Sequence, residues 1–185
     1  MDKEDLEAVK TLIRWMGDDP DREGLSDTPM RFLLSLKEFF SGYQEDPAEL
    51  LQKTFEEVDG YDELILLKNI EFYSHCEHHI SPIMGRVHVA YVPNHRVVGI
   101  SKLARLVDVY SRRLQVQERL TAQIAKTIYD ILKPMGVAII IEASHHCMTC
   151  RGIAKSQASM KTQSFLGCFT AEDWRKKLAY ALNGS

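Results

Sequence analysis

The stretch Cys76-Glu77-His78-His79 organises this chain, because it places a thiol, a carboxylate and two imidazoles in four consecutive residues. Thiolate and neutral imidazole are the ligand types that zinc prefers. Cys76 and His79 are three positions apart, so a tight turn can direct both side chains at one ion. A second segment, His-His-Cys-Met-Thr-Cys at 145–150, offers the further soft ligand that a tetrahedral ion needs. The two clusters together predict a zinc site.

Strand geometry relates the second cluster to the first. If the chain is extended there, His145 and Cys147 face the same way, because side chains two apart share one side of a strand. Both can then share a site with Cys76 and His79. Three protein ligands with an open fourth position indicate a catalytic zinc, whereas a fourth ligand from Cys150 would make a closed structural site. The pattern alone leaves both alternatives open.

The order of elements predicts an α+β fold. Apolar residues at helical spacing predict helices over 3–16, 28–41 and 47–55, so residues 1–60 are expected to form an N-terminal helical arm and residues 61–185 the domain that carries both clusters. Thr28 is the expected N-cap of the second helix, followed by proline. Later segments are expected as strands at 64–67, 87–91, 97–100, 137–141 and 160–169, with a hairpin turn at 93–96. Three further helices are expected, one capped by Ser101, one that begins at about Val116 and one capped by Thr170. This order favours an antiparallel sheet covered on one face by a helix pair, and its open edges favour association of several chains.

Composition excludes several classes of protein. The 185 residues are 45% hydrophobic and 26% charged, which is typical of a globular domain, and the net charge of -3 gives no nucleic-acid footprint. No apolar run is long enough for a membrane span, and the acidic start lacks the layout of a secretory signal. Four cysteines without such a signal are expected to be reduced thiols in a cytoplasmic protein.

Two polar segments are candidates for substrate contacts. Lys102 and Arg105 lie at the start of the helix expected from Ser101, and a basic helix N-terminus is a good phosphate site. The alternative is that these are solvated surface charges. The segment Gln-Val-Gln-Glu-Arg at 115–119 is either functional or a capping arrangement. A zinc deaminase is disfavoured, because its H-x-E and P-C-x-x-C motifs are absent.

Longer motifs around both clusters resemble the GTP cyclohydrolase I family. The resemblance covers about residues 5 to 170. It rests on Cys-Glu-His-His at 76–79, Gly-Ile-Ser-Lys-Leu-Ala-Arg-Leu-Val at 99–107, Arg-Arg-Leu-Gln-Val-Gln-Glu-Arg-Leu-Thr at 112–121, His-His-Cys-Met at 145–148 with Arg-Gly at 151–152, and Glu-Gly-Leu at 23–25 with Thr-Pro-Met-Arg at 28–31.

The resemblance implies an α+β tunnelling fold (T-fold) with a four-stranded antiparallel sheet, a covering helix pair and an N-terminal helical arm. It implies a homodecamer of two pentamers with active sites between subunits and one Zn²⁺ per subunit. The reaction would convert GTP and water to 7,8-dihydroneopterin triphosphate and formate, at the entry to folate or biopterin synthesis.

The resemblance also assigns roles to residues. Cys76, His79 and Cys147 would be the metal ligands, and His78 and His145 the acid/base pair. The remaining assignments are Arg31, Ser101, Lys102, Arg105 and Arg151 near the ribose and triphosphate, with Gln117 and Glu118 on the guanine.

The chain departs from the family pattern at Leu34, where some members have a basic residue, at the additional thiol of Cys150 and over residues 154–162. Two other functions remain open: another T-fold enzyme acting on a pterin or deazapurine, and a non-catalytic zinc-binding assembly protein. The presence of both Cys-Glu-His-His and Gln-Val-Gln-Glu disfavours the first alternative. The intact pair His78 and His145 disfavours the second.

Overall fold

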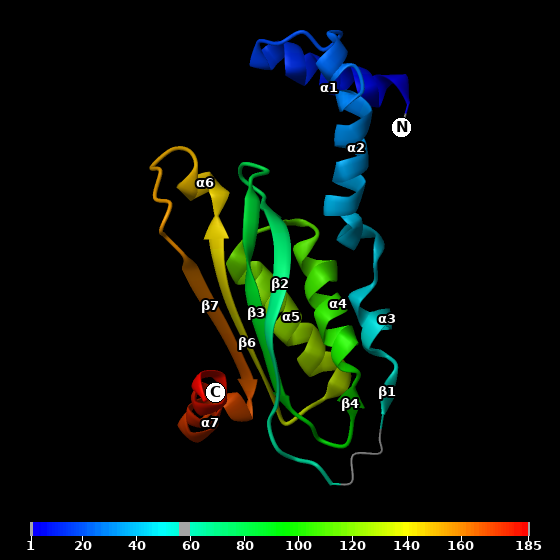
Figure 1. The fold of residues 1–185 in the computed structure, drawn as a ribbon. Helices are drawn as coiled ribbons and strands as arrows, with labels where there is room; N and C mark the ends of the chain where they lie inside the picture. The colour runs from blue at the N-terminus through cyan, green and yellow to red at the C-terminus, as the bar shows by residue number, and fades with distance from the viewer. Residues whose placement is uncertain (1, 56–59, 185) are drawn as a thin grey trace. The chain divides into compact units, whose positions relative to one another are not determined.

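The computed structural model describes residues 2–55 and 60–184 (Figure 1). The chain divides into two compact units, Met1–Ser41 and Gly42–Ser185. Among the described residues, none of the helices is both long and apolar enough to cross a bilayer.

The first unit is helical, as predicted. Asp2 and Asp5 form a capping box at the start of its first helix, and Gly17 ends this helix in the left-handed conformation with φ 98°. The prediction of Thr28 as an N-cap was wrong: Asp27 holds that position, and Thr28 and Pro29 form the first turn. The elements are α1 (Lys3–Met16), η1 (Glu23–Leu25) and α2 (Thr28–Phe39).

The second unit consists of a sheet and the helices packed on it. Its elements are α3 (Pro47–Leu51), β1 (Thr54–Phe55), β2 (Ile65–Cys76), β3 (Pro82–Val92), β4 (Val97–Val98), α4 (Ile100–Ser111), β5 (Leu114–Gln115), α5 (Gln117–Leu132), β6 (Gly136–His145), α6 (His146–Thr149), β7 (Met160–Gly167), η3 (Cys168–Thr170) and α7 (Glu172–Asn183), and η2 (Ser41–Gln44) leads into it.

The sheet has the strand order β5-β2-β3-β6-β7. The four long strands β2, β3, β6 and β7 pair antiparallel with one another, as predicted, but the sheet has five strands rather than four. The two-residue strand β5 adds a parallel edge to the end of β2, where Cys76 pairs with Gln115. The chain that enters α5 is therefore held beside the first Cys/His cluster.

Helices α4 and α5 cover one face of this sheet, as predicted (Figure 1). Alternate residues of the strands point to that face and form the main core with the apolar stripes of the two helices. The intervening residues Ala138 and Ile140 instead pack with Phe169 and Leu178, so α7 covers one end of the opposite face. Sequence reasoning had expected α7 but not its position.

Four local predictions were wrong. The segment 97–100 does not return along β3, because both edges of β3 are already paired with β2 and β6. Instead, the shorter strand β4 pairs with β1. Ser101 and Thr170 are not N-caps, since Gly99 and Ala171 hold those positions. Helix α3 ends at Leu51 rather than at residue 55.

Candidate metal centre and active site

The first Cys/His cluster forms a tight turn between β2 and β3. The amide of Ile80 donates to the carbonyl of Cys76 at 2.8 Å, and the amide of Cys76 donates to the carbonyl of Ser81, also at 2.8 Å. Ile80 takes a left-handed conformation with φ 52° to close the turn. These bonds bring the His79 side chain back over Cys76, as the sequence predicted.

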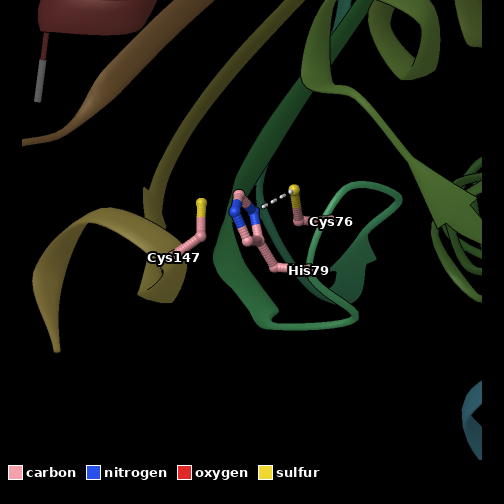
Figure 2. A group of neighbouring side chains, drawn as sticks. All are labelled: Cys76, His79 and Cys147. Atoms are coloured by element: carbon pink, nitrogen blue, oxygen red, sulfur yellow. Dashed lines mark hydrogen bonds between the residues drawn. The ribbon is translucent and has the colours of Figure 1, made fainter. Parts of the chain in front are cut away.

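Cys76, His79 and Cys147 are brought together at this end of the sheet (Figure 2). One ligand atom from each of the three lies within 4.8 Å of the other two. The Cys76 Sγ is 3.9 Å from the His79 Nδ1. Cys76 is buried, Cys147 half-buried and His79 exposed. Two thiol sulfurs and one imidazole nitrogen match the donor set that zinc prefers, so these residues fit such an ion.

Cys147 reaches the cluster by a different route from the one predicted. Extended geometry ends at His145, and Cys147 stands in the first turn of α6. Burial, and then the neighbouring Cys76 sulfur, raise the pKa of the Cys147 thiol. Cys150 is exposed at the C-cap of α6, and its Sγ donates to the carbonyl of His146 at 2.9 Å. Cys150 is therefore outside the cluster.

The two candidate acid/base histidines lie next to the cluster. His78 is exposed in the turn, with its Nδ1 3.7 Å from the Cys76 Sγ. His145 ends β6 opposite Ile83, the second residue of β3. Burial lowers the pKa of the His145 imidazole, and the carboxylate of Glu118 opposes that shift. Glu118 is exposed in the first turn of α5, near enough to act on His145.

An ion pair that the sequence did not indicate holds the turn against α5. The guanidinium of Arg119 pairs with Glu77, inside the Cys-Glu-His-His stretch. The Arg119 Nε donates to the Gln115 Oε1 at 3.2 Å, and the backbone amide of Glu77 donates to the Gln115 carbonyl at 3.1 Å. Arg119 thus fixes the position of the residues that carry the ligands.

Gln117, predicted to contact guanine, is buried and only 1% exposed. Its side-chain oxygen lies 2.8 Å from the Nε2 of His145. Its side-chain nitrogen donates to the carbonyls of Ile141 at 3.1 Å and Met160 at 3.0 Å and to the hydroxyl of Thr162 at 3.0 Å. No signal in the sequence pointed to these contacts, because they depend on how α5, β6 and β7 are placed.

The candidate phosphate-binding residues are spread over the chain. Arg151 is exposed just after α6. It lies near enough to Cys147 that its charge slightly opposes the rise in the pKa of that thiol. Ser101, Lys102 and Arg105 lie in the first half of α4, while the end of this helix adjoins β5 and the cluster. At 1.5 Å per residue, Ser101 is about 15 Å along the axis from Ser111 at the end of α4.

Two of these residues have specific surroundings in their own units. Lys102 lines a hollow of about 390 Å³ together with the acidic residues Glu45, Asp46 and Glu49. Arg31 belongs to the first unit, where its guanidinium donates to the carboxylate of Asp27 at 2.8 Å.

Comparison with known proteins extends these observations to nearly the whole chain. A family model described as GTP cyclohydrolase I matches residues 6–183. A protein named GTP cyclohydrolase 1 from Pelagibacter ubique (strain HTCC1062) is 56% identical over 168 residues, which are 91% of this chain and 83% of the relative. One of the same name from Sinorhizobium fredii (strain NBRC 101917 / NGR234) is 55% identical over 92% of this chain and 83% of its own length. One from Brucella anthropi (strain ATCC 49188) is 58% identical over 86% and 75%, respectively.

Proposed function

The chain belongs to the GTP cyclohydrolase I family. We propose how its residues convert GTP and water to 7,8-dihydroneopterin triphosphate and formate. The activity is that of the family. The observation that carries the assignment of roles is the meeting of Cys76, His79 and Cys147 beside His145 and Glu118. We take residues 61–185 as the catalytic part and residues 1–60 as an arm.

One Zn²⁺ per subunit is the proposed cofactor, held by Cys76, His79 and Cys147. Zinc, when bound, supplies a Lewis acid that makes a water molecule acidic enough to react near neutral pH. The exposure of His79 leaves one side of the cluster open to a small molecule. The hydrogen bond that turns the Cys150 thiol to the His146 carbonyl supports three protein ligands rather than four.

The two histidines move the protons. Guanine C8 is a poor electrophile, and protonation of the adjacent N7 makes it accept attack. His145 is the proposed donor of that proton, because imidazole exchanges protons at physiological pH. His78, exposed in the turn, is the second acid/base group for the later steps: opening of the imidazole ring, loss of formate and closure of the pterin ring.

Glu118 is the proposed guanine-recognition residue. Its carboxylate can accept from both N1–H and the exocyclic amine of guanine, and adenine offers no such pair of donors. Its exposure beside His145 supports this role, because a base bound to Glu118 would bring its imidazole ring toward His145.

The triphosphate is proposed to bind Arg151 of the chain that holds the base, and Ser101, Lys102, Arg105 and Arg31 of neighbouring chains. The separation of about 15 Å along α4 supports sites that are completed between subunits. The unpaired outer edges of β5 and β7 among the described strands also favour association. We propose a homodecamer of two pentamers that works in the cytoplasm, where its four cysteines stay reduced.

The activity is tested by incubating the zinc-loaded protein with GTP. A fluorescent pterin after oxidation, together with formate, is the expected result. Recovery of unchanged GTP would overturn the proposed function.

Subunit sharing is tested by mixing two inactive variants, Cys147→Ser and Lys102→Ala, after dissociation and reassembly. Hybrid oligomers should regain part of the activity, because some sites then combine an intact metal cluster with an intact lysine. Reassembly of oligomers without any recovery would contradict a shared site.

A further inference from the structure

Gln117 is the side chain whose contacts differ most from its expected role. In the first turn of α5 it points inward and is buried, whereas its neighbour Glu118 is exposed. Its amide joins three elements: α5, which carries it, β6 through Ile141 and His145, and β7 through Met160 and Thr162. Because both amide hydrogens are used within the fold and the side chain is buried, Gln117 is poorly placed to contact a bound base.

The contacts fix which end of the amide is nitrogen. Backbone carbonyls accept hydrogen bonds and never donate, so the group facing the carbonyls of Ile141 and Met160 must be the NH₂ group. A flipped amide would place its oxygen against two carbonyl oxygens. The Oε1 of Gln117 therefore faces the Nε2 of His145, at 2.8 Å.

A pair of threonine hydroxyls agrees with this orientation. The Thr121 hydroxyl donates to the backbone carbonyl of Gln117 at 2.7 Å. It can then only accept from the Thr162 hydroxyl, which lies 2.7 Å away. With its hydrogen directed at Thr121, Thr162 presents a lone pair to the Nε2 of Gln117. The two hydrogens of the Gln117 NH₂ group are shared among three acceptors, the two carbonyls and the Thr162 hydroxyl, and each contact has a consistent direction.

The tautomer of His145 follows from this network. An amide oxygen only accepts, so the Nε2 of His145 must carry the hydrogen. Among the described residues, no hydrogen bond to the Nδ1 of His145 is found, so this atom is the one that faces a ligand. It is also the atom that carries the second proton when His145 donates to N7 of guanine in the proposed function. We propose that Gln117, supported by Thr162, is a positioning residue that holds His145 as the Nε2–H tautomer, and that its side chain does not contact guanine. The proposal rests on the proposed function for the role of His145.

The kinetic test compares Thr162→Val with Thr162→Ser. Thr162 is on β7 and lies outside the residues assigned to GTP. If Gln117 contacted guanine, Thr162→Val would raise the KM for GTP and leave kcat unchanged. Loss of the hydroxyl should loosen Gln117 and His145 and lower kcat on the order of 100-fold, with the KM for GTP and the zinc content unchanged. Thr162→Ser should restore most of kcat, because it keeps the hydroxyl.

Gln117→Met, of similar length, should lower kcat in the same way. If it raises the KM for GTP with kcat unchanged, Gln117 is a guanine contact and the proposal is overturned. If Gln117→Met is not recovered folded, the Thr162 pair carries the test, and equal kcat in Thr162→Val and wild type overturns it.

A spectroscopic measurement gives an answer that does not depend on turnover. Solid-state ¹⁵N NMR of histidine-labelled protein, with His145 assigned by difference from His145→Asn, should show hydrogen on Nε2 in the wild type and a mixture of tautomers in Thr162→Val. Hydrogen on Nδ1 in the wild type would overturn the proposal. An inactive wild type with the Nε2–H signal would instead overturn the proposed function and leave the network intact.

Discussion

Replacing Cys147 by Ser should remove the metal, whereas replacing Cys150 by Ser should not, although the two thiols belong to one C-x-x-C segment. The Cys147 Sγ lies within 4.8 Å of the ligand atoms of Cys76 and His79. Cys150 is exposed, and its thiol is bonded to the carbonyl of His146. Their positions on α6, rather than their spacing in sequence, separate the two cysteines.

The magnitudes differ enough to measure. Four-ligand zinc sites bind with about 10–16 kcal/mol, which is roughly 2.5–4 kcal/mol per ligand. Loss of Cys147 should then weaken zinc binding about 100- to 1,000-fold. In Cys150→Ser the hydroxyl can keep the bond to the His146 carbonyl, and an exposed substitution of this kind changes stability by about 0.5 kcal/mol or less. Its zinc affinity should therefore stay within about threefold of wild type.

The assay is zinc content per chain after purification with reductant, followed by competition with a chromophoric chelator. Cys150→Ser serves as the matched control, because it makes the same chemical change three residues away. Cys150→Ser should also keep most of the pterin-forming activity. Loss of zinc from Cys150→Ser as complete as from Cys147→Ser would mean a closed site with four protein ligands, and the catalytic interpretation would be wrong.

Two further predictions concern charged residues outside the cluster. Arg119→Ala should lower zinc affinity about 10- to 100-fold, because it releases Glu77 in the turn that carries the ligands. If Arg119→Ala and wild type lose zinc equally to a competing chelator, the ion pair does not orient the ligands. Burial raises the pKa of Asp108, with Arg112 opposing and Glu45 adding, so the unfolded chain releases this proton at a lower pH than the folded chain. The stability that the protonated Asp108 contributes is lost as pH rises through its folded pKa. Asp108→Asn should therefore raise the melting temperature at pH 7 but not below pH 3.8, and a lower melting temperature at pH 7 would contradict this.

Periodicity was enough to predict most of the architecture, because helix and strand patterns are local and repeated. The boundaries of α1 agree with the prediction residue by residue. Caps were less predictable: Thr28, Ser101 and Thr170 all have the chemistry of N-caps, and each lies one or two residues from the actual cap. A capping bond contributes only about 0.5–2 kcal/mol, so packing of the helix can shift its start by a residue.

The metal ligands could be predicted from their chemistry, but their geometry could not. Ligand type selected Cys76, His79 and Cys147, and the three do meet. The reasoning that linked His145 to Cys147 assumed an extended chain, and α6 begins between them. The hydrogen bonds of Gln117 were beyond sequence reasoning altogether, since its partners come 24 to 45 residues later and are set by strand register.

Register is what joins the two clusters, which are far apart in sequence. β3 and β6 pair without interruption from Val92 opposite Gly136 to Ile83 opposite His145. A slip of one residue along this ladder would turn the side chain of His145 to the other face of the sheet. Gly85 stands near the same end, where an added Cβ would lie 2.2 Å from the carbonyl oxygen of Glu142. Glycine there permits the two strands to approach closely. The position of the backbone at His145 therefore depends on a residue that takes no part in the reaction.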